Sequence, residues 1–207
     1  MSTARPPSLS QDPRLTKGER TRLQLLEVAA AEFAERGFQH TRISDIVARA
    51  GVTQPVFYQY FTSKQAAYDE LVGMFAERLR GIIGQEREPG APGSGLDERV
   101  RASVGGLLAI LRENPDLTRI GFFQADSAED LKDELARMIA ARVRLEQQAG
   151  LFRAEVSAEL FAHALMGIIE RFVRQAPGQE SSTLSGFISD LLLDGARRRA
   201  APADMPA

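Results

Sequence analysis

Apolar residues recur at intervals of three and four along most of the chain, which is the spacing of one face of an α-helix. No segment shows sustained alternation of apolar and polar residues between turn residues, so the pattern predicts no strand. The predicted fold class is therefore all-α. Long helices are expected over residues 16–36, 64–86, 96–113, 127–148, 156–175 and 181–199, and shorter ones over residues 43–50, 54–60 and 116–124.

Segments rich in turn-forming residues divide this pattern into parts. Residues 1–15 are rich in Pro, Ser and Arg and predict a flexible tail, and residues 201–207 predict a second one. The stretch EPGAPGSG (88–95) cannot be crossed by a helix and predicts a flexible loop. Between the tails, we expect a small domain over residues 16–62 and a larger helical domain over residues 63–200.

Composition narrows the class of protein. With 43% hydrophobic and 26% charged residues, the 207-residue chain is typical of a globular protein, and no apolar run reaches the roughly 18–20 residues of a membrane span. The absence of cysteine excludes disulfides and fits a reducing cytoplasm. Residues 1–64 carry 9 Lys/Arg against 6 Asp/Glu, whereas the remainder is acidic, so the N-terminal part is the one that suits a polyanion.

Residues 43–60 have the features of a helix-turn-helix. Gly51 supplies a turn residue that tolerates positive φ, and Thr53 stands where it would cap the following helix. Pro55 falls in the first turn of that helix, where a missing N–H costs little. A common core with Phe33 of the first helix is expected for four apolar residues of this region: Ile46, Ala50, Val52 and Phe57.

The short helix after the turn would present Gln54, Tyr58 and Gln59 outward. In a helix-turn-helix, this second helix enters the major groove and reads bases with its N-terminal residues. A glutamine can pair with adenine through two hydrogen bonds, which is worth about 1–3 kcal/mol of discrimination.

Residues 17–64 resemble the DNA-binding domain of the tetracycline-repressor (TetR) family. The resemblance lies in FAERGF (33–38), TRISDIVARAGV (41–52) and VFYQYFTSK (56–64), which follow in the family's order and spacing. Two residues depart from the family's usual text, since Pro55 stands where Gly is common and Val47 where Ala is common. Pro55 can make only apolar contact, for example with a thymine methyl group, so it bears on which operator is read.

The resemblance implies a role in DNA binding for ten residues. Bases would be read at the start of the third helix and phosphates contacted around it, although Tyr60 suits packing support equally well and Phe57 and Phe61 suit the core. The implied DNA-binding residues are Thr41, Arg42, Thr53, Gln54, Pro55, Val56, Tyr58, Gln59, Tyr60 and Lys64.

Two C-terminal helices predict a dimer. Apolar positions on residues 157–175 cover an arc too wide for one neighbouring helix, and the last helix carries a second apolar stripe. Two such helices from each subunit would form a twofold-symmetric four-helix interface, as the family resemblance also implies. The predicted interface residues are Leu160, Phe161, Leu165, Ile168, Phe172, Leu184, Phe187, Ile188 and Leu191.

An effector pocket is expected inside the larger domain, and an apolar cavity there would suit a hydrophobic compound. Plain core packing is the alternative for every candidate residue, and surface exposure is the alternative for the possible polar anchors Arg119, His163 and Arg171. The candidates are Phe75, Leu79, Leu107, Leu111, Phe122, Phe123, Met138, Met166 and Ile169.

These observations favour a ligand-responsive transcriptional regulator, usually a repressor in this family, that binds a palindromic operator as a homodimer. The alternative is a ligand-independent or architectural DNA-binding protein. An enzyme is disfavoured because the chain has two histidines, no cysteine and no phosphate-cradling glycine-rich loop. No cofactor and no metal are expected, and the expected partners are duplex DNA, a small effector and a second copy of the chain.

Overall fold

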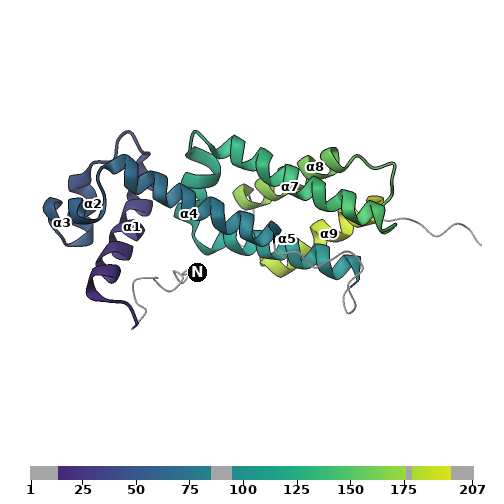
Figure 1. Cartoon of the computed structure of the whole chain (residues 1–207), viewed down its shortest axis with the longest axis horizontal. Helices are drawn as coiled ribbons and strands as arrows, with labels where there is room; N and C mark the ends of the chain where they lie inside the picture. The colour runs from purple at the N-terminus through teal and green to yellow at the C-terminus, as the bar shows by residue number, and fades with distance from the viewer. Residues whose placement is uncertain (1–13, 85–94, 176–178, 197–207) are drawn as a thin grey trace, which may run out of the picture. The chain divides into compact units, whose positions relative to one another are not determined.

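The computed structural model describes residues 14–84, 95–175 and 179–196, and within these ranges the chain is helical without a β-strand. The all-α prediction is confirmed. The elements are α1 (Lys17–Arg36), α2 (Ile43–Ala50), α3 (Gln54–Tyr60), α4 (Lys64–Gly84), α5 (Leu96–Glu113), α6 (Pro115–Thr118), the π-helix η2 (Arg119–Gln124), α7 (Ala128–Gln148), α8 (Ala158–Gln175) and α9 (Ser181–Ala196) (Figure 1). The predicted C-terminal tail, residues 1–13 of the predicted N-terminal tail and most of the predicted loop over residues 88–95 lie outside the described residues.

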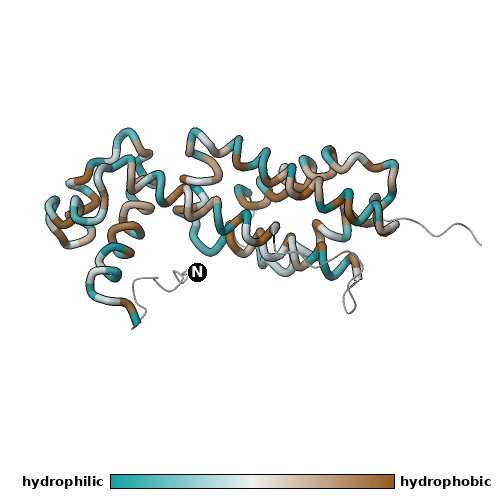
Figure 2. Tube along the Cα trace, viewed as in Figure 1, coloured by the Kyte–Doolittle hydropathy of each residue, from teal (hydrophilic) through white to brown (hydrophobic). Residues whose placement is uncertain are grey.

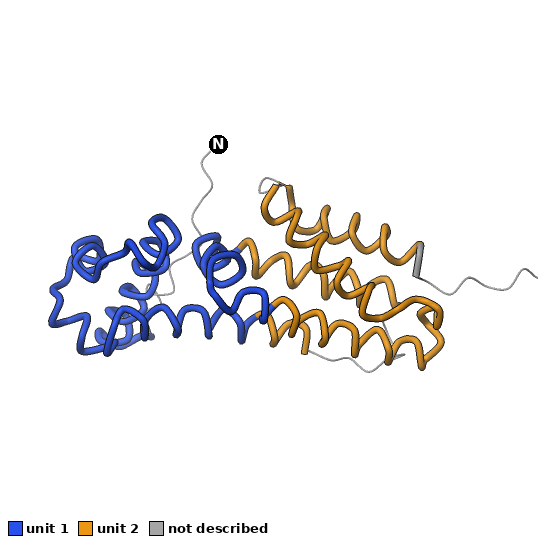
Figure 3. Tube along the Cα trace, turned by 90° about the horizontal axis from the view of Figure 1, so that it is seen from above, with its two compact units in different colours: residues 1–78, 113–131 blue, residues 79–112, 132–207 orange. Residues whose placement is uncertain are grey.

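The chain forms two compact units, coloured separately in Figure 3. Unit 1 comprises Met1–Arg78 and Glu113–Leu131, and unit 2 comprises Leu79–Arg112 and Lys132–Ala207. The chain therefore passes from one unit to the other inside α4, and the segment Glu113–Leu131 joins the N-terminal residues although it is remote in sequence.

Local signals account for the boundaries of α1 and α4. Thr16 and Glu19 form a reciprocal capping box at the start of α1, and Gly37, with φ of 80°, ends the helix. At the start of α4 the Ser63 hydroxyl accepts a hydrogen bond from the Ala66 N–H at 3.0 Å, which is the contact of an N-cap residue. These boundaries follow from the sequence because the contacts join residues three or four apart.

A single apolar core holds unit 1 together. It contains Phe33, Ile46 and Phe57, all fully buried, with Val52 packed against it, which agrees with the predicted helix-turn-helix core. Ile120 of η2 lies in the same core.

The weak helical pattern over residues 116–124 becomes α6 followed by the π-helix. Gly121 of η2 approaches the ring of Phe75 so closely that an added Cβ would lie 2.5 Å from it.

Unit 2 packs α5, α7, α8, α9 and the end of α4. Figure 2 shows apolar positions recurring along these helices, in keeping with their burial of leucine, valine and isoleucine side chains. Among the described residues, no helix is long and apolar enough to span a membrane, and no group of acidic or histidine side chains has the arrangement of a metal site.

Candidate nucleic-acid interface and cavity

The turn between α2 and α3 is built around Gly51. This residue adopts the left-handed conformation (φ 69°, ψ 28°), and its N–H donates to the carbonyls of Val47 and Ala48. The Val52 N–H also donates to the Val47 carbonyl at 3.0 Å, so the end of α2 is closed before α3 begins. The predicted turn is confirmed, and its hydrogen bonds fix the direction in which α3 leaves.

Helix α3 has one buried and one exposed side. Phe57 is fully buried, whereas Gln54, Pro55 and Gln59 are exposed and Tyr58 retains 54% of its exposure. The Tyr58 ring packs edge-on against Phe57 with 5.7 Å between centroids. An aromatic residue is thus held in a defined position without being buried, which leaves its hydroxyl accessible for a partner.

The side chain of Thr53 does not cap α3. Thr53 occupies the N-cap position with extended backbone, but it makes no side-chain capping hydrogen bond. The predicted capping role is therefore wrong, and the exposed hydroxyl stands at the N-terminus of α3 instead.

The polar groups of two predicted phosphate contacts are engaged inside unit 1. Thr41 is 1% exposed, and its hydroxyl lies 3.1 Å and 2.9 Å from the carbonyl oxygens of Glu32 and Gly37. The Lys64 ammonium donates to the carbonyls of Phe38 (2.6 Å) and Thr41 (2.9 Å) and lies 4.2 Å from the centroid of the Phe38 ring. Because the Thr41 side chain is buried, it is not available to contact DNA. The Lys64 ammonium instead binds two carbonyls of the loop between α1 and α2.

Three further predicted residues differ in exposure. Arg42 is exposed at the N-cap of α2, and Val56 is half-buried. Tyr60 is half-buried, packs against the core of unit 1, and places its hydroxyl beside Gly18 of α1. Of the two roles open to Tyr60, this position favours packing support.

Sequence reasoning missed an ion-pair cluster that joins α1 to α2. Glu32 is 3% exposed, and its carboxylate pairs with Arg49 at 2.8 Å and with Arg36 at 3.1 Å. The hydrogen bond from Arg49 to Glu32 raises the pKa of Arg49 above its usual range. The i,i+4 spacing of Glu32 and Arg36 could have predicted their ion pair from the sequence. The pairing of Glu32 with Arg49 depends on tertiary packing and could not.

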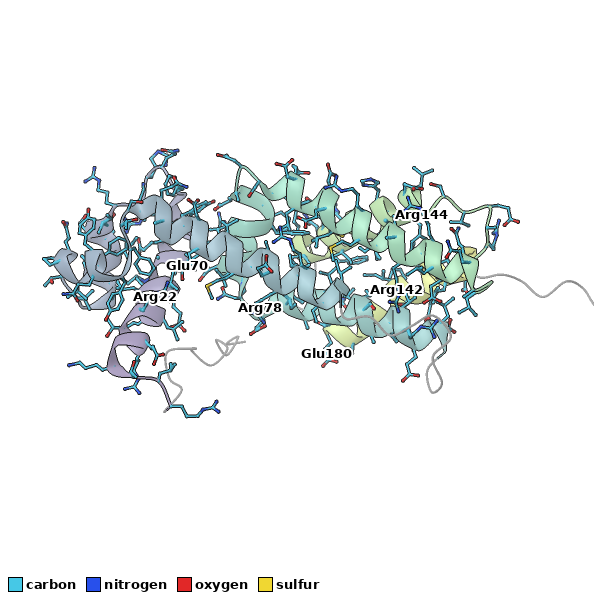
Figure 4. All side chains as sticks on the ribbon, viewed as in Figure 1. Arg22, Glu70, Arg78, Arg142, Arg144 and Glu180 are labelled. Atoms are coloured by element: carbon cyan, nitrogen blue, oxygen red, sulfur yellow. The ribbon has the colours of Figure 1, made fainter. Side chains whose placement is uncertain are left out.

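A second ion pair joins α4 to α1. It is formed by Arg22 and Glu70 at 2.6 Å, and both residues are labelled in Figure 4. The Arg22 guanidinium also lies 5.3 Å from the centroid of the Phe61 ring. With Lys64, this pair holds α1, the end of α3 and the start of α4 in one arrangement.

Unit 2 contains a cavity of about 100 Å³. It is lined by one face each of α5, α7 and α8, with Ile83 of α4 and Phe152 of the loop after α7. Most lining side chains are apolar, and the polar ones include Arg99, Arg142 and Glu146.

The cavity does not coincide with the predicted pocket. Of the nine candidates only Leu107 lines it. Phe75, Phe122 and Phe123 belong to unit 1, whereas the remaining candidates belong to unit 2 without lining the cavity: Leu79, Leu111, Met138, Met166 and Ile169. Arg119, His163 and Arg171 are exposed.

The predicted dimer residues fall into two groups. Leu160, Phe187 and Leu191 are 72%, 53% and 55% exposed, and Ile168 and Phe172 are half-buried. The structure buries the other four inside unit 2, which removes them from a surface with a second subunit: Phe161, Leu165, Leu184 and Ile188. The exposed members remain candidates for an interface.

Two helices joined by a glycine turn, the second with a polar exposed face, define a helix-turn-helix DNA-binding protein. Residues 25–71 match the bacterial regulatory proteins of the tetR family. The chain is 35% identical over 184 residues to YdgC, an uncharacterised HTH-type transcriptional regulator of Bacillus subtilis (strain 168), covering 87% of this chain and 94% of YdgC. It belongs to the TetR family of transcriptional regulators.

Two further comparisons agree. The chain is 30% identical over 205 residues to the HTH-type transcriptional repressor KstR2 of Rhodococcus jostii (strain RHA1), covering 91% of this chain and 96% of KstR2. It shares the fold of the TetR-family regulator PfmR from Thermus thermophilus, with a TM-score of 0.68 and 22% identity over 84% of this chain and 99% of PfmR. These relatives are transcriptional regulators and not enzymes, as the sequence indicated.

Proposed function

We propose that this chain is a ligand-responsive repressor that acts in the cytoplasm as a homodimer on a palindromic operator. The observation that carries the proposal is the exposed face of α3, where Gln54, Tyr58 and Gln59 surround a fully buried Phe57. Polar and aromatic side chains with free donors and acceptors suit base edges and phosphates, and a rigid buried anchor fixes their position.

The apolar surface of α8 and α9 supports the dimer. Leu160, Phe187 and Leu191 are more than half exposed, and the Phe172 and Phe187 rings lie 6.0 Å apart. Large apolar side chains grouped on two helices are the usual composition of a subunit interface. A dimer would bring two recognition helices to half-sites about 34–36 Å apart. It would therefore bind a palindromic operator more tightly than one short recognition helix could.

Connectivity supports a response to ligand. Ile83 of α4 lines the cavity of unit 2, whereas Ala67 and Leu71 of the same helix belong to the core of unit 1. Helices α5 and α7 line the cavity, and the segment between them, residues 114–127, contributes Ile120 to the core of unit 1. A hydrophobic effector that changes the packing of these helices would alter the position of the recognition helices and release DNA.

The first experiment selects bound sequences from random duplex DNA with the full chain. We expect an inverted repeat, and a selection without sequence enrichment would leave only the ligand-independent, architectural alternative. Titration of candidate compounds against the selected, labelled operator then tests the switch. If every compound that binds the protein leaves operator affinity unchanged, the chain is not a ligand-responsive repressor.

Two substitutions separate base reading from backbone contact. Gln54→Ala should relax the preference at one position of each half-site, at a cost of about 1–3 kcal/mol on the best operator. Tyr58→Phe should weaken all sequences to the same extent because it removes only a hydroxyl that contacts phosphate. Gln148→Ala, an exposed glutamine of α7, is the matched control. If Gln54→Ala and Tyr58→Phe both behave like this control, α3 is not the reading helix.

A further inference from the structure

Two charged residues, Arg171 and Asp194, lie among the apolar side chains that α8 and α9 leave open. Arg171 comes three residues after the half-buried Ile168 of α8, and Asp194 comes three residues after the exposed Leu191 of α9, so each shares a helical face with its apolar neighbour. Both charged side chains are exposed, and within the described ranges neither forms a hydrogen bond or an ion pair. They are a cation and an anion available to a partner on this face.

Other charged side chains of α8 and α9 are paired inside unit 2. Glu170 of α8 contacts Lys132 at 3.2 Å and Arg174 at 3.0 Å, and Asp190 of α9 contacts Arg101 at 2.7 Å. Unpaired charge is therefore not a general property of these two helices, and its presence on the open apolar face needs its own explanation.

The packing of α8 against α9 fixes how far along the helices each residue lies. Phe172, near the end of α8, has its ring 6.0 Å from that of Phe187, near the start of α9, and the two helices run antiparallel (Figure 1). Counting back four residues from Phe172 and forward four from Phe187 places Ile168 and Leu191 at about the same height along the helix axes.

We propose that Arg171 pairs with Asp194 of the partner subunit in a homodimer whose twofold axis passes at the height of Ile168 and Leu191. The inference rests on the proposed homodimer. It adds the position of the axis and the charged contacts by which the apolar face selects a second copy of this chain.

A twofold rotation is what brings the two charges together. Within one subunit Arg171 and Asp194 each follow the axis height by three residues on antiparallel helices, so they lie on opposite sides of it, about 9 Å apart along the helices. Rotation about an axis perpendicular to the helices exchanges the two sides, so each cation reaches the height of the other subunit's anion. The pair is therefore formed twice in each dimer.

The same rotation places a large apolar side chain over small ones. Phe187 lies four residues before Leu191, and Ala164 lies four residues before Ile168, so a ring from one subunit reaches the height of the alanine in the other. Ala164 is exposed, and a Cβ added to Gly167 would have no atom within 4 Å. This part of α8 therefore leaves room for the exposed ring of Phe187.

The energetics make the charged pair a device of specificity. An ion pair between exposed side chains contributes little affinity, whereas two like charges brought together at an interface are strongly unfavourable. Apolar side chains alone would accept many apolar surfaces in several orientations. One cation and one anion related by the twofold axis favour a second copy of this chain in a single orientation.

The test exchanges the charges in the full chain without DNA and follows assembly by sedimentation equilibrium and native mass spectrometry. Arg171→Glu and Asp194→Arg each place like charges together twice in a homodimer, so each variant should dimerise at least about tenfold more weakly than the unmodified chain. An equimolar mixture of the two variants should form mainly heterodimers, because both pairs are then of opposite charge.

A chain that carries both changes provides a second measurement. Arg171→Glu/Asp194→Arg should dimerise as the unmodified chain does, since the exchanged charges attract again. Mixed with the unmodified chain, it should form few heterodimers, because both contacts between the two chains would join like charges.

The matched control is a mixture of Arg137→Glu and Asp133→Arg. Both residues are exposed on α7, and the two variants have the same net charges as the two single variants of α8 and α9. They should dimerise like the unmodified chain and mix in the statistical proportion. Heterodimers favoured equally in this control would trace the effect to net charge and overturn the pair.

The outcomes separate this pair from the proposed homodimer. If the unmodified chain dimerises but the variants of α8 and α9 mix statistically, or if mixing does not restore dimers, the pair is overturned and the homodimer stands. If the unmodified chain is a monomer at the concentration at which it binds operator, the homodimer itself fails and the pair with it.

Discussion

Replacing Lys64 by methionine distinguishes two roles for the residue, a contact to phosphate and a clamp on the loop between α1 and α2. The ammonium donates to the carbonyls of Phe38 at 2.6 Å and Thr41 at 2.9 Å and lies over the Phe38 ring. A hydrogen bond from a charged donor contributes about 1.5–3 kcal/mol when its loss strands the partner. Because Lys64 is only half-buried, water can replace part of the lost hydrogen-bond energy, and methionine keeps the packing of the apolar part of the side chain.

We therefore expect Lys64→Met to lower the free energy of unfolding by about 2 kcal/mol. Urea unfolding of the DNA-free chain measures this loss, and hydrogen exchange of the amides of residues 38–42 should quicken, since the ammonium ties together both ends of that loop. The exposed Lys17→Met is the control and should change neither quantity.

The alternative outcome is equally clear. A side chain that only contacts phosphate would leave the DNA-free protein unchanged in both measurements and weaken operator binding alone. If Lys64→Met unfolds at the same urea concentration as the unmodified chain and exchanges its loop amides at the same rate, the clamp is refuted. A loss of operator affinity that accompanies loss of stability is expected from the clamp, because the same loop leads into α2.

Two other predictions concern packing and pH. Gly121→Ala would place a Cβ 2.5 Å from the buried ring of Phe75, so we expect a loss of about 1–3 kcal/mol of stability in urea unfolding, and an unchanged midpoint would show that the ring moves aside freely. The hydroxyl and backbone N–H of Thr16 donate to the carboxylate of Glu19 and lower its pKa below the usual range. A lowered folded-state pKa means that this capping contribution is present above the ordinary glutamate pKa and is lost as pH falls through the folded value. Amide exchange in the first turn of α1 should therefore report extra opening at acid pH after correction for its intrinsic pH dependence, and Thr16→Ala should remove most of that pH response.

Contacts between near neighbours in sequence were predictable. The capping box at Thr16, the Ser63 cap and the left-handed Gly51 all depend on residues three to five apart, so the sequence alone contains the necessary information. The exposed face of α3 could also be predicted in part, because burying Phe57 turns Gln59 to the opposite side of the helix and Tyr58 to its flank.

Contacts between distant residues were not. From the sequence, Lys64 looks like an ordinary exposed charged residue. Only the fold brings the carbonyls of Phe38 and Thr41 within reach of its ammonium. The π-helical turn over residues 119–124 likewise depends on tertiary packing, since Gly121 lies directly against Phe75, which is remote in the chain.

The cavity shows a further limit of periodicity. An apolar helical face indicates that a side chain is buried, but it does not indicate whether that side chain packs against a neighbour or lines a cavity. Leu111 and Leu107 occupy equivalent positions one turn apart on α5, and only Leu107 lines the cavity. Arg99 and Glu146 show the same limit, because charges on the buried faces of two helices predict a partner of opposite charge but do not say which residue it is.

The same reasoning explains why several of the predicted dimer residues are buried within unit 2. An apolar arc that is too wide for one neighbour must be covered twice, but the arc itself does not say which residues face which neighbour. On α9, Ile188 is fully buried, whereas Phe187 beside it and Leu191 three residues further are more than half exposed. One helix thus divides its apolar surface between its own unit and solvent, and a second subunit that covers Phe187 and Leu191 would bury the part that the monomer leaves open. Charged substitutions at these two positions should therefore shift the proposed dimer to monomers without unfolding unit 2, whereas a charge at Ile188 should unfold it.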